Sequence, residues 1–178
     1  MTPRNLLAIR HAPTLASGIC HGQWQAPLLL SHEDAARRMR EALGNDSVSC
    51  LWTSDLPRCR EPASLLAREL EVRLEVTSSL REMSMGDWEG RSWADLERED
   101  AERVRHWMAS WQTEAPPGGE LLEAFEARVR RWHAKLGAED TVLIAHAGVV
   151  RCLQVLRRGL DWSDAMAMEV PHLTLVRL

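Results

Sequence analysis

Two histidines in this sequence directly follow short apolar runs. His11 comes after Asn5–Arg10, and His146 comes after Thr141–Ala145. A further basic residue, Arg58, opens a later helical stretch. An imidazole can attack phosphorus as a nucleophile, and arginine forks bind phosphate oxygens in pairs. These residue types therefore point to the chemistry of a tetrahedral dianion, and to phosphoryl transfer in particular.

Phosphoryl transfer also needs a proton donor for the leaving oxygen, and Glu82 is the best candidate carboxyl group. A histidine at the end of a strand is, by itself, more often a core residue bonded to the backbone. Arg10 and Arg58 change that balance, because a buried guanidinium without an anion is costly. We therefore interpret the two arginines and the two histidines as one anion site.

An α/β fold would bring these residues together. Short runs that are apolar throughout predict parallel strands covered on both faces, with helices between them. The fold class we expect is a three-layer α/β/α sandwich with a mostly parallel central sheet. Residues 1–178 would form a single domain, in which a lid-like insertion at 82–118 places small helices over the C-terminal ends of the strands, where ligands bind in such sheets. The sequence predicts strands at Asn5–Arg10, Val48–Thr53, Arg73–Val76, Thr141–Ala145 and His172–Leu178, and helices at 31–43, 57–70, 92–111, 121–136 and 149–157.

Composition limits the possible partners. The chain has 178 residues, 26 acidic and 22 basic side chains, and a formal net charge of −4. No overall positive field attracts nucleic acid, and the apolar runs are far below the ~18 residues of a membrane span. The start of the chain has no signal-like apolar segment, and the four cysteines form no C-x-x-C pair. We expect a cytoplasmic protein that acts on a small phosphorylated metabolite, as a monomer or homodimer, without nucleic-acid or membrane partners.

Four motifs follow one another along the chain: Arg10-His11, Ser54-Asp55-Leu56-Pro57-Arg58, Leu80-Arg81-Glu82-Met83 with Gly86-Asp87-Trp88-Glu89-Gly90, and Ala145-His146-Ala147-Gly148. In this order they resemble the histidine phosphatase superfamily, the phosphoglycerate mutase-like group. An Arg-His dipeptide alone is common, whereas four motifs placed where the fold needs them are specific. The resemblance covers roughly residues 5–152.

The resemblance implies a role for each of these residues. His11 would be the phosphorylated nucleophile, and Glu82 would protonate the leaving alcohol and later activate water. The phosphoryl group would be held by Arg10, Arg58 and His146, and further substrate contacts would come from Thr14, Gly22, Gln23 and Ala147. The superfamily needs no metal and no cofactor.

The sequence departs from the family pattern at two positions. Ala12 and Ala147 stand where glycine usually follows the two histidines. Alanine fits there only if the backbone keeps a negative φ, and its methyl group narrows the approach to phosphate. We expect both alanines to be tolerated.

Within the superfamily, residues 18–28, 85–90 and 116–120 resemble the corresponding segments of α-ribazole phosphatases, the cobalamin-pathway enzymes. The resemblance implies a phosphomonoesterase for α-ribazole 5′-phosphate or a similar small metabolite. Three alternatives stay open: a broad-specificity small-molecule phosphatase, a phosphoglycerate mutase-type phosphotransferase, and a catalytically silent phospho-ligand binder.

Other residues have simpler interpretations beside functional ones. His21 is equally suited to contacting substrate and to being solvated. Cys59 is expected to be a packed thiol, and Arg128–Arg131 a solvated helix face. The lid tryptophans are expected to pack the small subdomain, with stacking on an aromatic leaving group as the alternative; they are Trp88, Trp93, Trp107 and Trp111. The remaining histidines are expected to be surface or core residues, namely His32, His106, His133 and His172.

Overall fold

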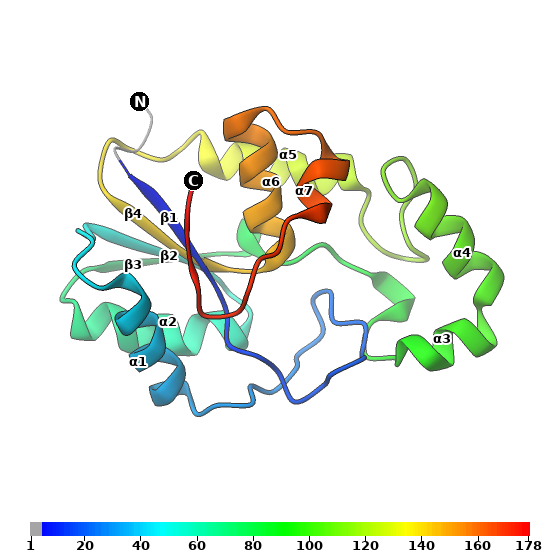
Figure 1. Cartoon of the computed structure of the whole chain (residues 1–178), viewed down its shortest axis with the longest axis horizontal. Helices are drawn as coiled ribbons and strands as arrows, with labels where there is room; N and C mark the ends of the chain where they lie inside the picture. The colour runs from blue at the N-terminus through cyan, green and yellow to red at the C-terminus, as the bar shows by residue number, and fades with distance from the viewer. Residues whose placement is uncertain (1–4) are drawn as a thin grey trace.

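The computed structural model describes residues 5–178, and its centre is a five-stranded sheet flanked by helices (Figure 1). The strands are β1 (Leu6–Arg10), β2 (Cys50–Ser54), β3 (Arg73–Thr77), β4 (Thr141–Ala145) and β5 (Leu175–Arg177). The helices are α1 (His32–Leu43), α2 (Pro57–Glu69), α3 (Trp93–Glu99), α4 (Ala101–Ser110), α5 (Leu122–His133), α6 (Ala147–Arg158) and α7 (Trp162–Ala167). Two short 3₁₀ helices span Ser78–Leu80 and Gly86–Trp88.

The sheet is mostly parallel, as the sequence predicts. Its strand order is β3-β2-β4-β1-β5, and β5 runs antiparallel to β1 at one edge. The register pairs Arg10 of β1 with Ala145 of β4. The residues that follow these two strands therefore leave the sheet side by side, at the C-terminal ends of the strands.

The two central strands are apolar throughout because both faces of the sheet are covered. In β1, Leu6 and Ala8 face the core beneath α5 and α6, whereas Leu7 and Ile9 face the core beneath α1 and α2. The strand β4 alternates in the same way between the two clusters. This arrangement gives the three layers that the apolar runs predict.

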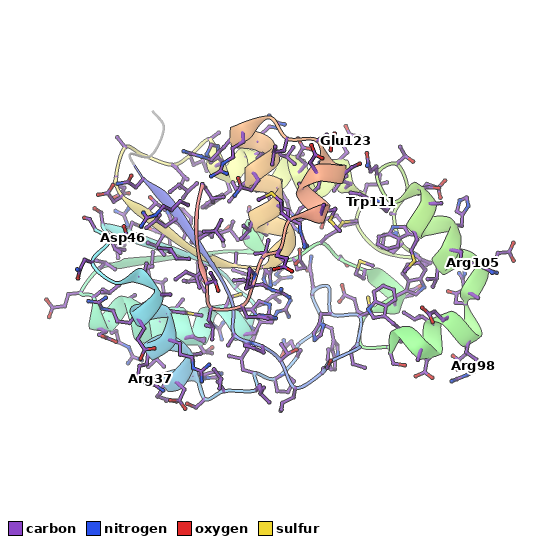
Figure 2. All side chains as sticks on the ribbon, viewed as in Figure 1. Arg37, Asp46, Arg98, Arg105, Trp111 and Glu123 are labelled. Carbon is purple, nitrogen blue, oxygen red and sulfur yellow. The ribbon has the colours of Figure 1, made fainter. Side chains whose placement is uncertain are left out.

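The segment predicted as one helical stretch over 92–111 consists of two helices, α3 and α4, separated at Asp100. Asp100 has non-helical φ and ψ of −137° and 28°, and its carboxylate accepts a hydrogen bond of 3.0 Å from Trp88 Nε1. A small third cluster that includes the buried Trp88 packs beneath these helices. Figure 2 shows Arg98 and Arg105 on the outer side of the two helices and Trp111 on the side toward α5 and α7.

The C-terminal strand is shorter than expected. The prediction of a strand over His172–Leu178 was wrong at its start, because Leu173 adopts a positive φ of 57° and interrupts the extended chain before β5. The helix α7 was not predicted, although Asp161 caps it by accepting from the Asp164 amide at 2.8 Å. Among residues 5–178, no helix is long and apolar enough to cross a bilayer.

Candidate active site

The two histidines that follow β1 and β4 meet at the edge of the sheet. The amide of His11 donates to the Ala145 carbonyl at 3.0 Å, which continues the strand pairing by one residue. The ring centroids of His11 and His146 lie 5.1 Å apart in an edge-to-face arrangement. Both side chains are buried. The parallel register of β1 and β4 is the direct cause of this pairing.

Hydrogen bonding determines which nitrogen of His11 is available for reaction. Nδ1 lies 2.7 Å from the carbonyl oxygen of Ala12, and because a carbonyl only accepts, Nδ1 carries the proton. The lone pair of the neutral ring is then on Nε2. Burial, and next the Arg58 charge, hold the pKa of His11 well below its ordinary value. The unprotonated form is the one able to attack an electrophile.

Two arginines bring positive charge to the same edge. Arg58, in the first turn of α2, donates to the carbonyls of Trp24 at 2.7 Å and Gly22 at 2.6 Å. Arg10 donates to the Val170 carbonyl at 2.9 Å. The Nε atom of each arginine is buried and has no hydrogen-bond partner among residues 5–178. Burial lowers the pKa of both guanidiniums, so each carries a desolvated charge that an oxyanion would satisfy.

Glu82 lies between the two 3₁₀ helices and comes to the same edge. One carboxylate oxygen accepts from the Met83 amide at 3.0 Å, and the other accepts from the Gly148 amide at 3.1 Å. A Cβ atom on residue 148 would lie 2.2 Å from Oε1 of Glu82. A side chain at this position in the first turn of α6 would therefore displace the Glu82 carboxylate.

The segment that carries Glu82 is held by Arg128 of α5. Its guanidinium donates to the carbonyls of Ser79, Arg81 and Glu82 at 2.7–2.9 Å. The same group forms an ion pair with Glu120 at 2.7 Å, and its side chain is only 13% exposed. The prediction of a solvated helix face was wrong for this residue. No local spacing in the sequence points to these contacts, which join residues 46 to 49 positions apart in the chain.

A small cavity of about 100 Å³ lies where these groups converge. It is lined by Arg10, His11, Thr14, His21, Arg58, Glu82, His146 and His172. The structure thus brings together all five residues expected to take part in catalysis. It adds His21, which bonds through Nε2 to the Thr14 hydroxyl at 2.8 Å.

His172 is the lining residue that sequence reasoning missed. Its Nδ1 donates to the carbonyl of His11 at 2.6 Å, and the two rings lie 5.2 Å apart. The sequence gives no sign of this contact, because His172 follows neither an apolar strand nor a helix start. Only the return of the chain alongside Arg10 places it there.

The expected substrate contacts at Gly22 and Gln23 have different surroundings. Gly22 lines a neighbouring larger cavity. The Gln23 side chain lines neither cavity in the described chain, since its amide nitrogen donates to the Glu82 carbonyl at 3.2 Å and its oxygen accepts from Arg81. Glu89, a second carboxylate near the site, accepts from the amides of Gln23 and Met85, each at 2.9 Å, and ties two loops together.

The two alanines that replace glycines fit the backbone. Within residues 5–178, the non-glycine residues with positive φ are Glu71 and Leu173, so Ala12 and Ala147 both keep negative φ. Ala147 is the first residue of α6 and does not line the small cavity. The expectation that alanine is tolerated at these positions is therefore compatible with the local conformation.

Cys59 is packed against the site without being reactive. Its sulfur lies 3.6 Å from Nε2 of His146 and is fully buried. Burial raises the pKa of this thiol well above its ordinary value, which keeps it protonated and poorly nucleophilic. Cys59 is the packed thiol that the sequence predicts.

A larger cavity of about 620 Å³ opens beside the small one, and the two share Arg10, His21 and Glu82. Its walls are mostly aromatic and sulfur-containing side chains from α3, α4, α5, α7, the segment before α3 and the residue after α4. They include Trp93, Trp107, Trp111, Phe125, Trp162, Met83, Met85, Met108 and Met166. Three of the four lid tryptophans thus line a cavity, whereas Trp88 is buried in the third cluster.

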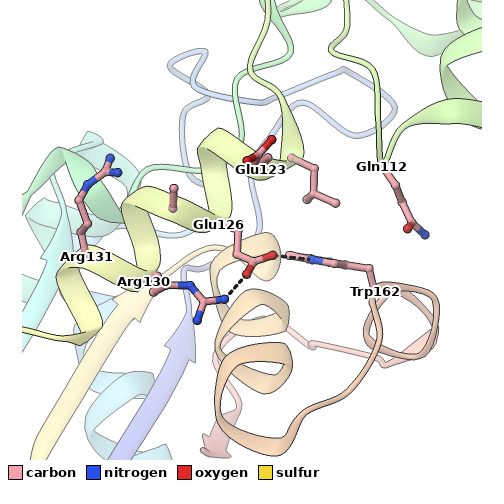
Figure 3. Close-up of a pocket in the computed structure, with 8 residues that line it drawn as sticks. Gln112, Glu123, Glu126, Arg130, Arg131 and Trp162 are labelled. Carbon is pink, nitrogen blue, oxygen red and sulfur yellow. Dashed lines mark hydrogen bonds and ion pairs between the residues drawn. The ribbon is translucent and has the colours of Figure 1, made fainter.

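The Trp162 side chain, which forms part of this cavity's wall, is held by a hydrogen bond to Glu126. Figure 3 shows Glu126 of α5 between Arg130 and Trp162, in a second, charged groove on the outer surface. Glu126 accepts from Trp162 Nε1 at 3.2 Å and also pairs with Arg130. The Trp162 ring is thereby held edge-to-face with Trp111, at 6.2 Å between centroids. Trp162 thus donates its indole N–H to Glu126, while its ring lines the larger cavity.

Comparison with known proteins agrees with this arrangement. Adenosylcobalamin/alpha-ribazole phosphatase of Escherichia coli is 32% identical over 154 residues, which cover 83% of this chain and 76% of that protein. Glucosyl-3-phosphoglycerate phosphatase of Mycobacterium tuberculosis is 30% identical, covering 86% of this chain and 74% of that protein. The crystal structure of the alpha-ribazole phosphatase from Shigella flexneri aligns with a TM-score of 0.87 at 28% identity, over 97% of this chain and 89% of that chain.

A buried imidazole, two desolvated guanidiniums and a carboxyl group at one sheet edge define a phosphoryl-transfer enzyme. The sequence matches the histidine phosphatase superfamily (branch 1) over residues 6–178, and the chain belongs to this family. It is a phosphatase that works through a phosphohistidine, as the resemblance of its motifs predicts.

Proposed function

We propose that His11 is the nucleophile and Glu82 the general acid of a two-step phosphomonoester hydrolysis. In the first step, Nε2 of His11 attacks phosphorus as the bond to the leaving oxygen breaks, and protonated Glu82 gives its proton to that oxygen. In the second step, water attacks phosphorus, Glu82 accepts a proton from the water, and the N–P bond breaks. Phosphate is released, and both residues return to their initial states.

The observation that carries this proposal is the pairing of Nδ1 of His11 with the Ala12 carbonyl, beside two arginines whose buried Nε atoms have no hydrogen-bond partner in the described residues. Arg10 and Arg58 would bind the phosphoryl oxygens, with His146 as a further partner. The start of α6 follows His146 directly, and its Gly148 amide holds the Glu82 carboxylate in place beside these groups. The charge that develops on the equatorial oxygens would therefore meet preorganised donors.

The substrate we propose is α-ribazole 5′-phosphate or a similar small phosphate ester with a flat, largely apolar leaving group. The aromatic walls of the 620 Å³ cavity support this choice, because they continue directly from the phosphate-binding edge. Aromatic side chains of this kind stack on planar rings. The names of the E. coli and S. flexneri relatives point the same way.

A substrate panel tests this proposal. The enzyme is expected to release inorganic phosphate from α-ribazole 5′-phosphate with a higher kcat/KM than from glycerol phosphate. His11→Ala should abolish turnover and acid-labile phosphate labelling of the protein, because phosphoryl transfer then has no acceptor. Labelling of that variant at wild-type stoichiometry would refute the assignment.

The same panel separates the alternatives. Equal kcat/KM on all esters would indicate a broad-specificity phosphatase. Transfer of the phosphoryl group to a second metabolite without release of phosphate would indicate a mutase, and binding without turnover would indicate a phospho-ligand binder.

We further propose that the reaction needs no metal or other cofactor, since the guanidiniums can neutralise the phosphoryl charge themselves. Activity should be unchanged by EDTA, and a loss that a divalent cation restores would overturn this proposal. A cytoplasmic location, a monomeric or homodimeric state and the absence of nucleic-acid partners stay predictions. So does the identity of residues 82–118 as a lid-like insertion in one domain.

A further inference from the structure

One arginine near the active site has no part in the chemistry described above. Arg151 lies on α6, one turn after Gly148, and lines the larger cavity together with Arg10. Its charge is among the causes, after burial, that lower the pKa of Arg10. Arg151 is thus close enough to the phosphate-binding edge to contact the part of a substrate that adjoins the phosphoryl group.

The hydrogen bonding of Arg151 is incomplete. One terminal nitrogen donates to the Met168 carbonyl at 3.1 Å. Its Nε atom is buried and has no partner in the described part of the chain. No carboxylate of residues 5–178 lies within ion-pair distance of this guanidinium. Arg10 and Arg58 share these features, and both lie where an oxyanion is expected.

The surroundings of Arg151 explain why a guanidinium with incomplete hydrogen bonding is informative there. Half of the residues that line this cavity are tryptophan, methionine or phenylalanine, and the carboxylate in its lining, Glu82, already accepts from the Met83 and Gly148 amides. A buried donor without an acceptor is destabilising, and a ligand oxygen that accepts from the Nε atom of Arg151 would remove that cost. The guanidinium presents its donors in a planar fork, which matches two adjacent oxygens better than one.

We propose that Arg151 is a specificity-determining residue that binds a pair of oxygens on the leaving group. The inference rests on the proposed function, because it assigns a contact to the substrate of that reaction. Two leaving-group structures carry such a pair: the vicinal hydroxyls of a ribose and the carboxylate of a phosphorylated acid. The aromatic walls then receive the remaining part of the leaving group.

Matched substrates test this contact. The wild-type enzyme is assayed with adenosine 5′-monophosphate and its 2′,3′-dideoxy analogue, which differ in the vicinal hydroxyls. It is also assayed with 3-phosphoglycerate and 2-hydroxypropyl phosphate, which differ in the carboxylate. We expect kcat/KM to favour the oxygen-bearing member of at least one pair by about 10- to 100-fold, the range for a hydrogen bond to a charged group. The pair that shows the preference identifies the source of the oxygens.

Arg151→Met should reduce that preference to about twofold or less while changing kcat/KM for p-nitrophenyl phosphate, which lacks both groups, by less than about threefold. Arg158→Met is the matched control, because Arg158 is also on α6 and also donates to a backbone carbonyl, that of Arg177 at 2.8 Å. The control should keep the wild-type preference. If Arg151→Met does not fold, Arg151→Lys carries the same test, because lysine keeps the charge and lacks the planar fork.

Two results would overturn the inference. One is a wild-type enzyme that hydrolyses all four esters without preference within either pair. The other is an Arg151 variant that keeps the preference or loses activity equally on every substrate, including p-nitrophenyl phosphate. Either result leaves the proposed hydrolysis intact, since that proposal fails only if phosphate is not released through His11.

Discussion

Gly148→Ala adds one methyl group at the point where α6 meets Glu82. An ideal Cβ at this position lies 2.2 Å from the carboxylate oxygen Oε1, whereas ordinary contacts begin at 3.4 Å. The carboxylate must therefore move by about 1 Å, a misplacement that can cost on the order of 10²-fold in rate. The hydrogen bond from the Gly148 amide to Glu82 would be lost or weakened by the same movement.

Gly148→Ala should lower the turnover of alkyl phosphates and leave the stability of the fold nearly unchanged. Turnover of an alkyl phosphate should fall by about 10²-fold, because an alkoxide leaves poorly without a proton. The phosphorylation step with p-nitrophenyl phosphate should fall much less, since nitrophenolate leaves well unaided. Inhibition by vanadate should persist, because Arg10 and Arg58 are untouched. The free energy of unfolding should change by no more than about 1 kcal/mol, since alanine is the better helix former.

Burst kinetics on the two substrates and denaturant unfolding measure these quantities. Gly137→Ala is the control, because Gly137 has an ordinary φ and nothing within 4 Å of an added Cβ. It should match the wild type in both assays. An unchanged rate with the alkyl phosphate, or an equal loss of the burst rate on both substrates, would refute Glu82 as a proton donor held by Gly148.

Two further predictions follow from the same site. Arg128→Met should lower kcat for alkyl phosphates by about 10-fold or more with little change in vanadate inhibition, because the substitution frees the segment that carries Glu82. An equal loss of kcat and of vanadate inhibition would make Arg128 a structural residue only. The free energy of unfolding should fall as the pH drops below the ordinary histidine value of 6.5, since burial lowers the pKa of His11 and His146 in the folded protein and only the unfolded chain takes up their protons. Each histidine contributes a loss of about 1 kcal/mol in the free energy of unfolding between pH 6.5 and 5.5. In urea unfolding, His146→Asn should therefore show a shallower pH dependence of this free energy than the wild type. Identical slopes would contradict the lowered pKa of His146.

Local sequence patterns are enough to predict the sheet and the residues at its edge. Apolar runs before His11 and His146 predict buried parallel strands, and parallel strands place the residues that follow them at one edge. The motif that contains Arg58 follows β2, so the same argument places Arg58 at this edge of the sheet. These features depend on local patterns, which a single sequence displays directly.

The contacts that hold the Glu82 segment, and those that extend the site into the aromatic cavity, arise from the packing of the folded chain. The carboxylate of Glu82 meets the Gly148 amide across 66 positions of sequence, and the His172 ring meets the His11 carbonyl across 161. Arg128 was expected in solvent, and its place beneath the Glu82 segment depends on how α5 packs against the chain. The position of Arg151 beside an aromatic cavity likewise depends on how α4, α6 and α7 pack. Contacts of this kind leave no periodicity or spacing in the sequence, because they are set by the packing of whole elements.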